Sequence, residues 1–258
     1  MRILVTNDDG LYAPGLRVLV KTLAEMAEIY VVAPDRERSG TGHGITVFEP
    51  IMIKRVNEIA EAQSAWIVCG TPVDCVKLGI AALLPQKPDL VVSGINNGAN
   101  LGWDVLYSGT VSAAMEGVIM GVPSIAVSLC VDGGEEDYSF AARFTRAVCR
   151  QLEKDGFDKD TIININVPAI PRSQIKGMRV TRLGRRQYEN VFEERKDPRG
   201  NTYFWMGGDV VEEDQEPDSD VTAIHEGFIS LTPIHFDLTN YALVEKYRQI
   251  YRDYVDHC

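Results

Sequence analysis

The sequence predicts an α/β fold in which a mostly parallel sheet is covered by helices on both faces. Over the first two-thirds of the chain, short apolar runs alternate with amphipathic stretches of helical length. Such alternation is typical of parallel strands joined by helices. After Pro168 the chain becomes rich in Arg, Glu, Asp and Gly, which predicts hairpins or an extended arm. A C-terminal helix is expected to follow.

The first elements are expected near the start of the chain. Residues 3–5 are Ile, Leu and Val, an apolar run that predicts a buried strand. Pro14 begins a helix, because proline suits the first helical position. The apolar face of this helix carries Leu16, Leu19, Val20, Leu23, Ala24 and Ala27. Residues 29–33 form a second strand, and the polar, glycine-rich residues 35–44 form a loop.

The alternation continues as far as Pro168. Residues 71–74, Thr-Pro-Val-Asp, indicate a capped helix start with proline at its first position. In chain order, we expect strands at 46–56 and 65–68 that form a side hairpin, the helix beginning at Pro72, a strand at 90–92, a helix at 111–120, a strand at 124–129, a helix at 140–152 and a strand at 162–167.

The segment after Pro168 has a different character. Short strands are expected at residues 178–183, 203–206 and 228–231, followed by a helix at about 240–254. Aromatic and apolar side chains recur on that helix at helical spacing: Tyr241, Val244, Tyr247, Ile250, Tyr251 and Tyr254. Such a stripe usually packs on the body of the protein or on a partner subunit.

Composition restricts the classes of function. The 258 residues fit one large domain, or one domain with an appendage, and a net charge of −11 argues against binding to a nucleic-acid polymer. The sequence has no recognisable signal peptide and no apolar run of roughly 18 residues, so we expect no membrane association. The five cysteines are scattered and predict reduced core thiols in a cytoplasmic protein: Cys69, Cys75, Cys130, Cys149 and Cys258.

Two adjacent carboxylates follow the first strand. Asp8 and Asp9 precede Gly10, and an Asp-Asp-Gly sequence by itself can be a simple turn. At the carboxyl end of a central strand, however, two neighbouring negative charges remain ionised only near solvent or a cation. A divalent cation is therefore the alternative to a turn.

Two other loops are expected to meet this one, because ligands of open α/β sheets bind beyond the carboxyl ends of the strands. The loop at 34–44 contains Ser39 and three glycines, and it also contains His43, a candidate proton donor. The segment after residue 92 supplies Asn96. Residues 107–110, Tyr-Ser-Gly-Thr, begin a helix. They form either a simple helix cap or an anion site.

Together these loops predict a metal site beside a phosphate site. Asp8, Asp9, Ser39 and Asn96 offer only oxygen donors, which suit magnesium, manganese or calcium rather than zinc. Neither a P-loop nor a dinucleotide-binding motif occurs. Two further carboxylates are left out of the site: Asp74 as a residue of a helix first turn, and Asp104 as a loop or interface residue.

Five long motifs carry a resemblance to a known family. They are residues 3–10 (ILVTNDDG), 33–40 (APDRERSG), 70–76 (GTPVDCV), 93–96 (SGIN) with 100–102 (NLG), and 107–111 (YSGTV) with 113–117 (AAMEG). Near the end, 229–233 (ISLTP) and 237–239 (DLT) also fit. In these motifs the chain resembles the SurE family of stationary-phase survival proteins, which are metal-dependent nucleotidases.

The resemblance implies a 5′-nucleotidase, a phosphoric monoester hydrolase that acts on nucleoside monophosphates. It extends to 3′-nucleotides and short polyphosphate for some members. It implies one divalent metal ion per subunit, magnesium or manganese with calcium as a further possibility in a crystal, on Asp8, Asp9, Ser39 and Asn96. It also implies a Rossmann-like core at 1–170, and a hairpin arm with a C-terminal helix at 171–258, exchanged between subunits of a homodimer or homotetramer.

For the chemistry, Asp8 and Asp9 are the expected catalytic residues. The expected phosphate ligands are Gly40, Asn100, Ser108, Gly109 and Thr110. A divalent ion would neutralise phosphate charge and activate water, while direct attack by Asp8 through a phospho-aspartate stays open. Two other classes of function also stay open: a phospho-accepting signalling domain of the receiver type, and a nucleotide sensor without turnover.

Overall fold

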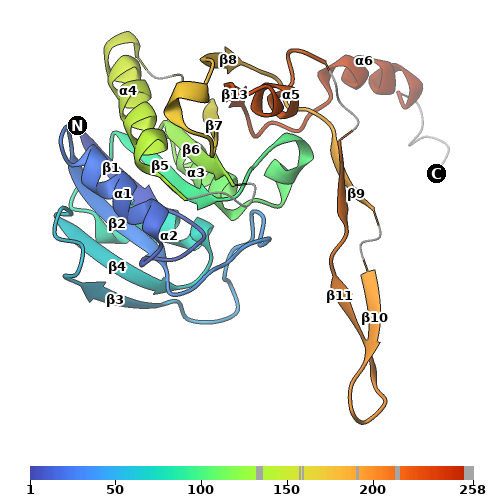
Figure 1. The fold of residues 1–258 in the computed structure, drawn as a ribbon, viewed down its shortest axis with the longest axis horizontal. Helices are drawn as coiled ribbons and strands as arrows, with labels where there is room; N and C mark the ends of the chain where they lie inside the picture. The colour runs from blue at the N-terminus through green and yellow to red at the C-terminus, as the bar shows by residue number, and fades with distance from the viewer. Residues whose placement is uncertain (132–135, 157, 159, 190–191, 213–215, 253–258) are drawn as a thin grey trace.

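The computed structural model describes residues 1–131, 136–156, 158, 160–189, 192–212 and 216–252. Tyr254 and Cys258, for which the sequence made predictions, lie outside these residues. Within the described ranges, nine strands form one sheet in the order β3-β4-β2-β1-β5-β6-β7-β13-β8 (Figure 1). The pairs among β4, β2, β1, β5, β6 and β7 are all parallel. The predicted α/β class is therefore confirmed.

The bounds of the elements follow the chain. Those of the first part are β1 Arg2–Thr6, α1 Pro14–Leu23, β2 Glu28–Pro34, β3 Met52–Val56, β4 Ser64–Cys69, α2 Pro72–Leu78 with a π-helical turn η1 Gly79–Leu83, β5 Leu90–Asn97, the 3-10 helix η2 Gly102–Leu106, α3 Gly109–Ile119, β6 Ser124–Cys130, α4 Ser139–Asp155 and β7 Ile162–Pro168. Those of the second part are η3 Arg172–Gln174, β8 Met178–Val180, β9 Arg186–Glu189, β10 Phe192–Lys196, β11 Thr202–Met206, β12 Asp209–Glu212, α5 Asp220–His225, β13 Ile229–Ile234 and α6 Tyr241–Ile250.

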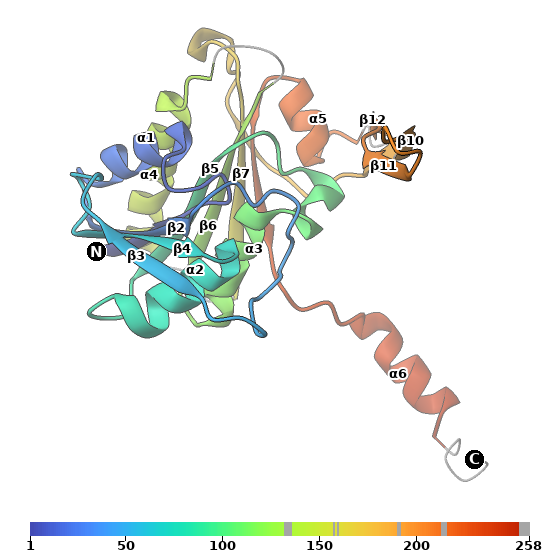
Figure 2. The same cartoon turned by 90° about the horizontal axis from the view of Figure 1, so that it is seen from below.

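The helices cover both faces of the sheet (Figure 2). Ile3 and Val5 of β1 point into a core shared with α1 and α4, whereas Leu4 points into the core beneath α2 and α3. This alternation follows from the two-residue period of a strand. It explains why a strand covered on both faces reads as a continuous apolar run.

The strand order reverses direction at β1. From β1 the chain goes outward through β2 to the edge strand β3 and its neighbour β4 on one side. It then returns to β5 and continues through β6 to β7 on the other side. The carboxyl ends of β1 and β5 therefore flank a topological switch point, the usual ligand-binding position in open α/β sheets.

Four strand predictions were wrong at one end. The strand expected at 178–183 ends at Val180, and the one expected at 228–231 continues to Ile234. The other two lie in the first part of the chain. The expected strand at 46–56 begins only at Met52, because the backbone amide and the hydroxyl of Thr46 bind the Asp74 carboxylate instead of a neighbouring strand. The expected strand at 90–92 continues to Asn97. At Gly94 it bends so closely past β6 that a Cβ there would lie 2.3 Å from the carbonyl oxygen of Val127.

The segment after Pro168 is divided between the sheet and an arm. β13 pairs with β7 and β8 pairs with β13, so both strands extend the central sheet. β9 pairs with β12 and β10 with β11 in two separate antiparallel ribbons, which project from the body (Figure 1). The predicted hairpin arm is therefore formed by β9 to β12, whose described residues are 186–189, 192–196, 202–206 and 209–212.

The C-terminal helix does not pack on the body. α6 contains no buried residue, and it extends away from the sheet (Figure 2). Tyr241 is 70% exposed and Tyr247 is 51% exposed. Of the two places expected for this stripe, the body of the protein is excluded by the structure. A partner subunit remains a prediction.

Two further observations bear on the composition. Cys75 and Cys149 are buried as expected, but Cys69 is exposed, so the prediction of core thiols is wrong for that residue. Within the described ranges, no helix is both long and apolar enough to cross a bilayer.

Candidate active site

A pocket of about 700 Å³ opens at the carboxyl ends of β1, β2 and β5. Residues from the three loops singled out in the sequence line it, together with residues from η2 and the arm. The lining residues are Asp8, Ser39, Gly40, Asn96, Asn97, Ala99, Asn100, Trp103, Asp104, Tyr107, Ser108, Arg186 and Met206. The predicted donors Asp8, Ser39 and Asn96 therefore meet in one cavity of a size typical for small ligands.

Asp8 is held against the start of α3. Its side chain is only 4% exposed, and the Thr110 hydroxyl donates a hydrogen bond to its Oδ1 atom. Gly109 leaves the necessary room, because a Cβ there would lie 2.7 Å from the Cβ of Asp8. Burial raises the pKa of Asp8 and outweighs the opposing hydrogen bond from Thr110. The carboxylate is thus rigidly placed and poorly solvated.

Asp9 faces a neighbouring, smaller cavity of about 200 Å³, which it lines with Asn97, Glu136 and Tyr138. The backbone amide of Asn97 donates to its Oδ2 atom at 3.2 Å. Burial, followed by the nearby Asp8 charge, raises the pKa of Asp9 to about 7. The two carboxylates therefore sit on adjacent cavities rather than side by side on one wall.

The loop after β2 brings Ser39 and Gly40 to the pocket. The Ser39 hydroxyl donates to Glu37 at 2.8 Å, which leaves its oxygen lone pairs for a ligand. Gly40 has a φ of 72°, a left-handed conformation that glycine adopts without strain. The candidate proton donor His43 instead contacts Glu116 at 2.9 Å.

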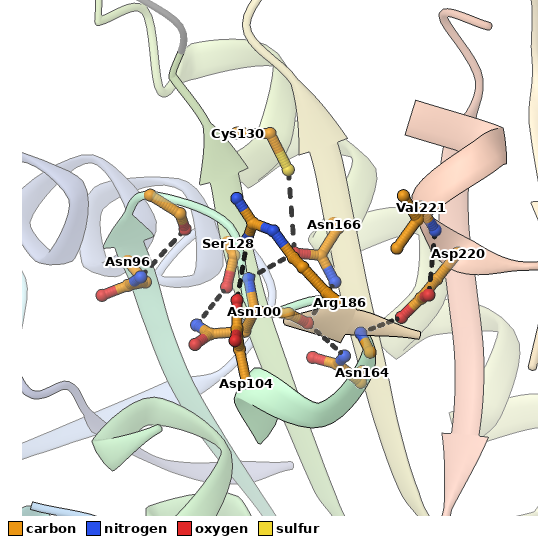
Figure 3. Close-up of polar contacts among 12 residues, drawn as sticks. Asn96, Asn100, Asp104, Ser128, Cys130, Asn164, Asn166, Arg186, Asp220 and Val221 are labelled. Carbon is orange, nitrogen blue, oxygen red and sulfur yellow. Dashed lines mark hydrogen bonds and ion pairs between the residues drawn. The ribbon is translucent and has the colours of Figure 1, made fainter. Parts of the chain in front are cut away.

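Asn96 lies within β5, not in a loop as the sequence predicted. It pairs with Ser128 of β6, just after the bend at Gly94. Its Nδ2 atom donates to the carbonyl of Gly98 at 2.9 Å (Figure 3). This bond fixes the orientation of the amide, so that its carbonyl oxygen is the atom available for a cation.

Asn100 is held by a buried polar network (Figure 3). Its Nδ2 atom donates to the Ser128 hydroxyl at 2.8 Å, and its backbone amide donates to Asn166 at 2.9 Å. The backbone carbonyl oxygen of Asn100 accepts hydrogen bonds from the side-chain amides of Asn164 and Asn166. These three supporting residues were not predicted from the sequence. The feature of the sequence that could have indicated them is the presence of polar side chains inside the otherwise apolar runs at 124–129 and 162–167.

The remaining predicted phosphate ligands lie at the start of α3. Ser108 lines the pocket and is the N-cap of α3, with its hydroxyl accepting from the backbone amide of Val111 at 3.1 Å. Gly109 and Thr110 form the first turn and contact Asp8. Free amides and the helix dipole make such a turn favourable for an anion.

One wall of the pocket was not predicted from the sequence either. Arg186 of the arm donates to Asp104 at 2.8 Å (Figure 3), so Asp104 is an ion-pair partner as expected of a loop residue. Trp103 and Tyr107 come from η2 and the turn after it, and Met206 comes from β11. Asp74, by contrast, completes the capping box of α2 with Thr71, as expected of a first-turn residue.

The donor set fits a hard divalent cation. Asp8 and Asp9 both have raised pKa values because they are buried, and the ion pairs found among the described residues do not involve either carboxylate. A bound cation would offset this uncompensated charge. The described residues contain no cluster of three His, Cys, Asp or Glu side chains suited to a metal, so Ser39 and Asn96 would complete the site.

The sheet and the pocket define an α/β protein with an acidic, oxygen-rich site at the switch point of a parallel sheet. Residues 3–190 match the family model described as "Survival protein SurE". The chain belongs to the SurE family.

Relatives and a solved structure agree with this assignment. A protein named 5′-nucleotidase SurE from Syntrophomonas wolfei is 61% identical over 254 residues, covering 98% of this chain and 96% of its own. One of the same name from Heliobacterium modesticaldum is 54% identical over 246 residues, covering 95% and 90%. The crystal structure of SurE protein from Aquifex aeolicus superposes with a TM-score of 0.82 at 38% identity, covering 97% and 99%.

Proposed function

We propose that this protein is a metal-dependent 5′-nucleotidase that hydrolyses nucleoside monophosphates to nucleoside and phosphate. The observation that carries the proposal is the contact between Asp8 and Thr110, which joins a buried carboxylate to the anion-favouring first turn of α3. The relatives at 61% and 54% identity are named 5′-nucleotidases and match almost the whole chain. Hydrolysis of 3′-nucleotides and of short polyphosphate belongs to the same proposal.

One divalent ion per subunit, magnesium or manganese, would be held by Asp8, Asp9, Ser39 and Asn96. When bound, such an ion supplies charge neutralisation at the phosphate and lowers the pKa of water. Thr110 keeps Asp8 in a single orientation, and the amide of Asn97 does the same for Asp9. Asp9, at the edge of the site, is the residue that we expect to orient the attacking water.

The phosphate would lie between the Ser39 loop and α3. Gly40, Asn100 and Ser108 line the pocket there, and the amides of Gly109 and Thr110 belong to the first turn of the helix. Asn100 is held by β6 and β7, so it can bind an oxygen without reorganising. Pre-organised donors of this kind stabilise charge that develops in a transition state.

The deciding experiment measures phosphate release from a panel of nucleoside monophosphates with magnesium, with manganese and with a chelator. We expect release that depends on the metal and that the chelator abolishes. Absence of metal-dependent release would overturn the proposal. In that case, stable phosphorylation of Asp8 would support a receiver-type switch, and nucleotide binding without turnover would support a sensor.

The division of the chain into regions and its oligomeric state are proposed as well. Residues 1–170 would be the metal- and phosphate-binding core, and residues 171–258 the oligomerisation region of a cytoplasmic homodimer or homotetramer. The exposed Tyr241 and Tyr247 of α6 and Tyr251 directly after it support this, because such a stripe gains stability when it is covered. Light scattering of the full chain and of a chain ending before α6 would test it, and an unchanged mass per assembly would contradict it.

A further inference from the structure

We propose that Trp103 is the platform on which the nucleobase stacks, with Tyr107 and Met206 beside it. This inference rests on the proposed nucleotidase function and extends it from the phosphate to the other end of the substrate. It assigns a role to three residues that the phosphate chemistry leaves unused.

The first argument is position. Trp103, Tyr107 and Met206 line the same 700 Å³ cavity as Asp8, Ser39 and Ser108. Tyr107 immediately precedes Ser108, the cap of α3. A ligand with its phosphate at the start of α3 therefore has an aromatic wall within the same pocket. The volume exceeds what a phosphate group alone needs and suits a ligand of nucleotide size.

The second argument is exposure. Trp103 is 46% exposed, Tyr107 is 67% exposed and Met206 is 76% exposed. In the described part of the chain, neither ring is stacked on another aromatic ring. Large apolar side chains grouped at a polar pocket indicate a binding surface. A flat, uncharged ring system is the occupant that matches them, because every base presents a π-face.

The third argument is rigidity, since η2 is fixed at both ends. The Gly102 amide donates to the buried Asp220 carboxylate at 2.9 Å, and the Tyr107 carbonyl accepts from the amide of Gly42 at 3.0 Å. Between them, Asp104 is ion-paired to Arg186 at 2.8 Å. Binding a base would therefore cost little ordering of the platform.

The same arrangement predicts which substrates depend most on Trp103. Stacking distinguishes bases by ring size rather than by hydrogen-bonding pattern. The Asp104–Arg186 pair carries no net charge, so this wall does not favour a charged ligand over a neutral base. A purine buries more ring area than a pyrimidine and should be bound more tightly.

The test compares the wild type with Trp103→Ala, Trp103→Phe and Leu106→Ala. Leu106 is the matched control, because it is a 59% exposed residue of the same 3-10 helix and does not belong to the pocket lining. Each variant is assayed for kcat/KM on AMP, GMP, CMP and UMP and on ribose 5-phosphate, which lacks a base. The inhibition constant of inorganic phosphate reports the phosphate end alone.

For Trp103→Ala we expect a loss of kcat/KM of roughly ten- to a hundredfold on nucleotides, with a smaller difference between purines and pyrimidines. The phosphate inhibition constant and the rate on ribose 5-phosphate should stay unchanged, Trp103→Phe should restore most of the loss, and Leu106→Ala should resemble the wild type.

Two outcomes would overturn the platform while leaving the nucleotidase intact. One is equal kinetics of Trp103→Ala and wild type on all nucleotides. The other is an equal loss on nucleotides and on ribose 5-phosphate together with a changed oligomeric state, which would assign Trp103 to a subunit contact. A wild-type protein that hydrolyses no nucleotide would instead refute the proposed function itself.

Discussion

The Nε2 atom of His43 lies 2.9 Å from Oε2 of Glu116, although 73 positions separate the two residues in the chain. Glu116 is a buried residue of α3, and its other oxygen accepts from Lys77 of α2 at 2.6 Å. Burial alone would raise the pKa of Glu116, but the hydrogen bonds from His43 and Lys77 lower it instead. This ionised carboxylate connects the loop that carries Ser39 to α3, the helix whose first turn belongs to the proposed phosphate site.

Replacing His43 with alanine should weaken metal activation. The loop that carries Ser39 and Gly40 would lose its bond to Glu116, so the metal concentration for half-maximal activity should rise about three- to tenfold. Metal titrations of activity measure this effect. His235→Ala is the matched control, because His235 is an exposed residue after β13. Equal titration curves for His43→Ala and the wild type would contradict the anchoring role.

The Asp9→Asn variant should change activity and stability in opposite directions. Loss of a proposed ligand should lower metal-dependent turnover by roughly a hundredfold or more. In the chelated protein, the pKa of Asp9 is raised to about 7 by burial and by Asp8. A raised pKa contributes stability below the ordinary value near 3.8, and this contribution is lost as the pH rises through about 7.

At pH 8 with chelator, Asp9→Asn should therefore be more stable than the wild type by a few kcal/mol, up to about 4 kcal/mol, because the pKa of Asp9 is raised from 3.8 to about 7. The difference should shrink toward pH 4. Denaturant melts at the two pH values measure it. A variant that is equally destabilised at both pH values would show that Asp9 stabilises the fold and is not kept for binding a cation.

Gly109→Ala, at the first residue of α3, should inactivate the protein while leaving the central sheet intact. The new methyl group would lie 2.7 Å from the Cβ of Asp8, so the carboxylate must move away from Thr110. We expect a loss of activity of roughly a hundredfold. Gly207→Ala serves as the control, because a Cβ there meets no atom within 4 Å. Full activity of Gly109→Ala would remove Asp8 from the site.

Asp74→Ala should destabilise the fold in a pH-dependent way. Its carboxylate accepts from the amide and hydroxyl of Thr46 and from the amide of Thr71. Burial opposes ionisation, but these bonds outweigh it and lower the pKa of Asp74 below its ordinary value of 3.8. At neutral pH the variant should lose about 2–4 kcal/mol of unfolding free energy.

The sign of the pKa shift sets the pH range. A lowered pKa gives stability that is present above about pH 4 and is lost as the pH falls through the folded-state value. The difference in unfolding free energy between the wild type and Asp74→Ala should thus become smaller below pH 4, as measured by chemical denaturation. Glu49→Ala, at an exposed position before β3, should show no such gap. A constant gap from pH 7 to pH 3 would assign the loss to packing alone.

The sequence was sufficient to predict an element of the fold where the local pattern and the tertiary structure favour the same conformation. The apolar run at 3–5 predicted β1 because a strand buried on both faces has no polar alternation. Asn96 shows the opposite case. Ser93, Gly94 and Asn97 favour a turn over a strand, so the strand was expected to end at Val92. Pairing with β6 overrides that preference and extends β5 to Asn97.

The site was predictable in its polar part and not in its aromatic wall. Asp8, Ser39 and Asn96 follow or end neighbouring parallel strands, and topology alone brings such positions together. The wall depends on the arm, where Arg186 meets Asp104 across 82 positions of sequence. No local pattern specifies that contact. Trp103 and Met206 therefore belong to one pocket only once the arm has been placed.

The reversal of strand order at β1 makes the pocket a reporter of folding. The proposed donors come from segments after β1, after β2 and at the end of β5, and these meet only when all three strands have paired. The unfolded chain cannot assemble such a set of ligands. A cation that binds the native state alone should thus raise the melting temperature with its concentration, by mass action. Cation binding and the cooperative folding of the central sheet are therefore thermodynamically linked, and a measurement of one reports on the other.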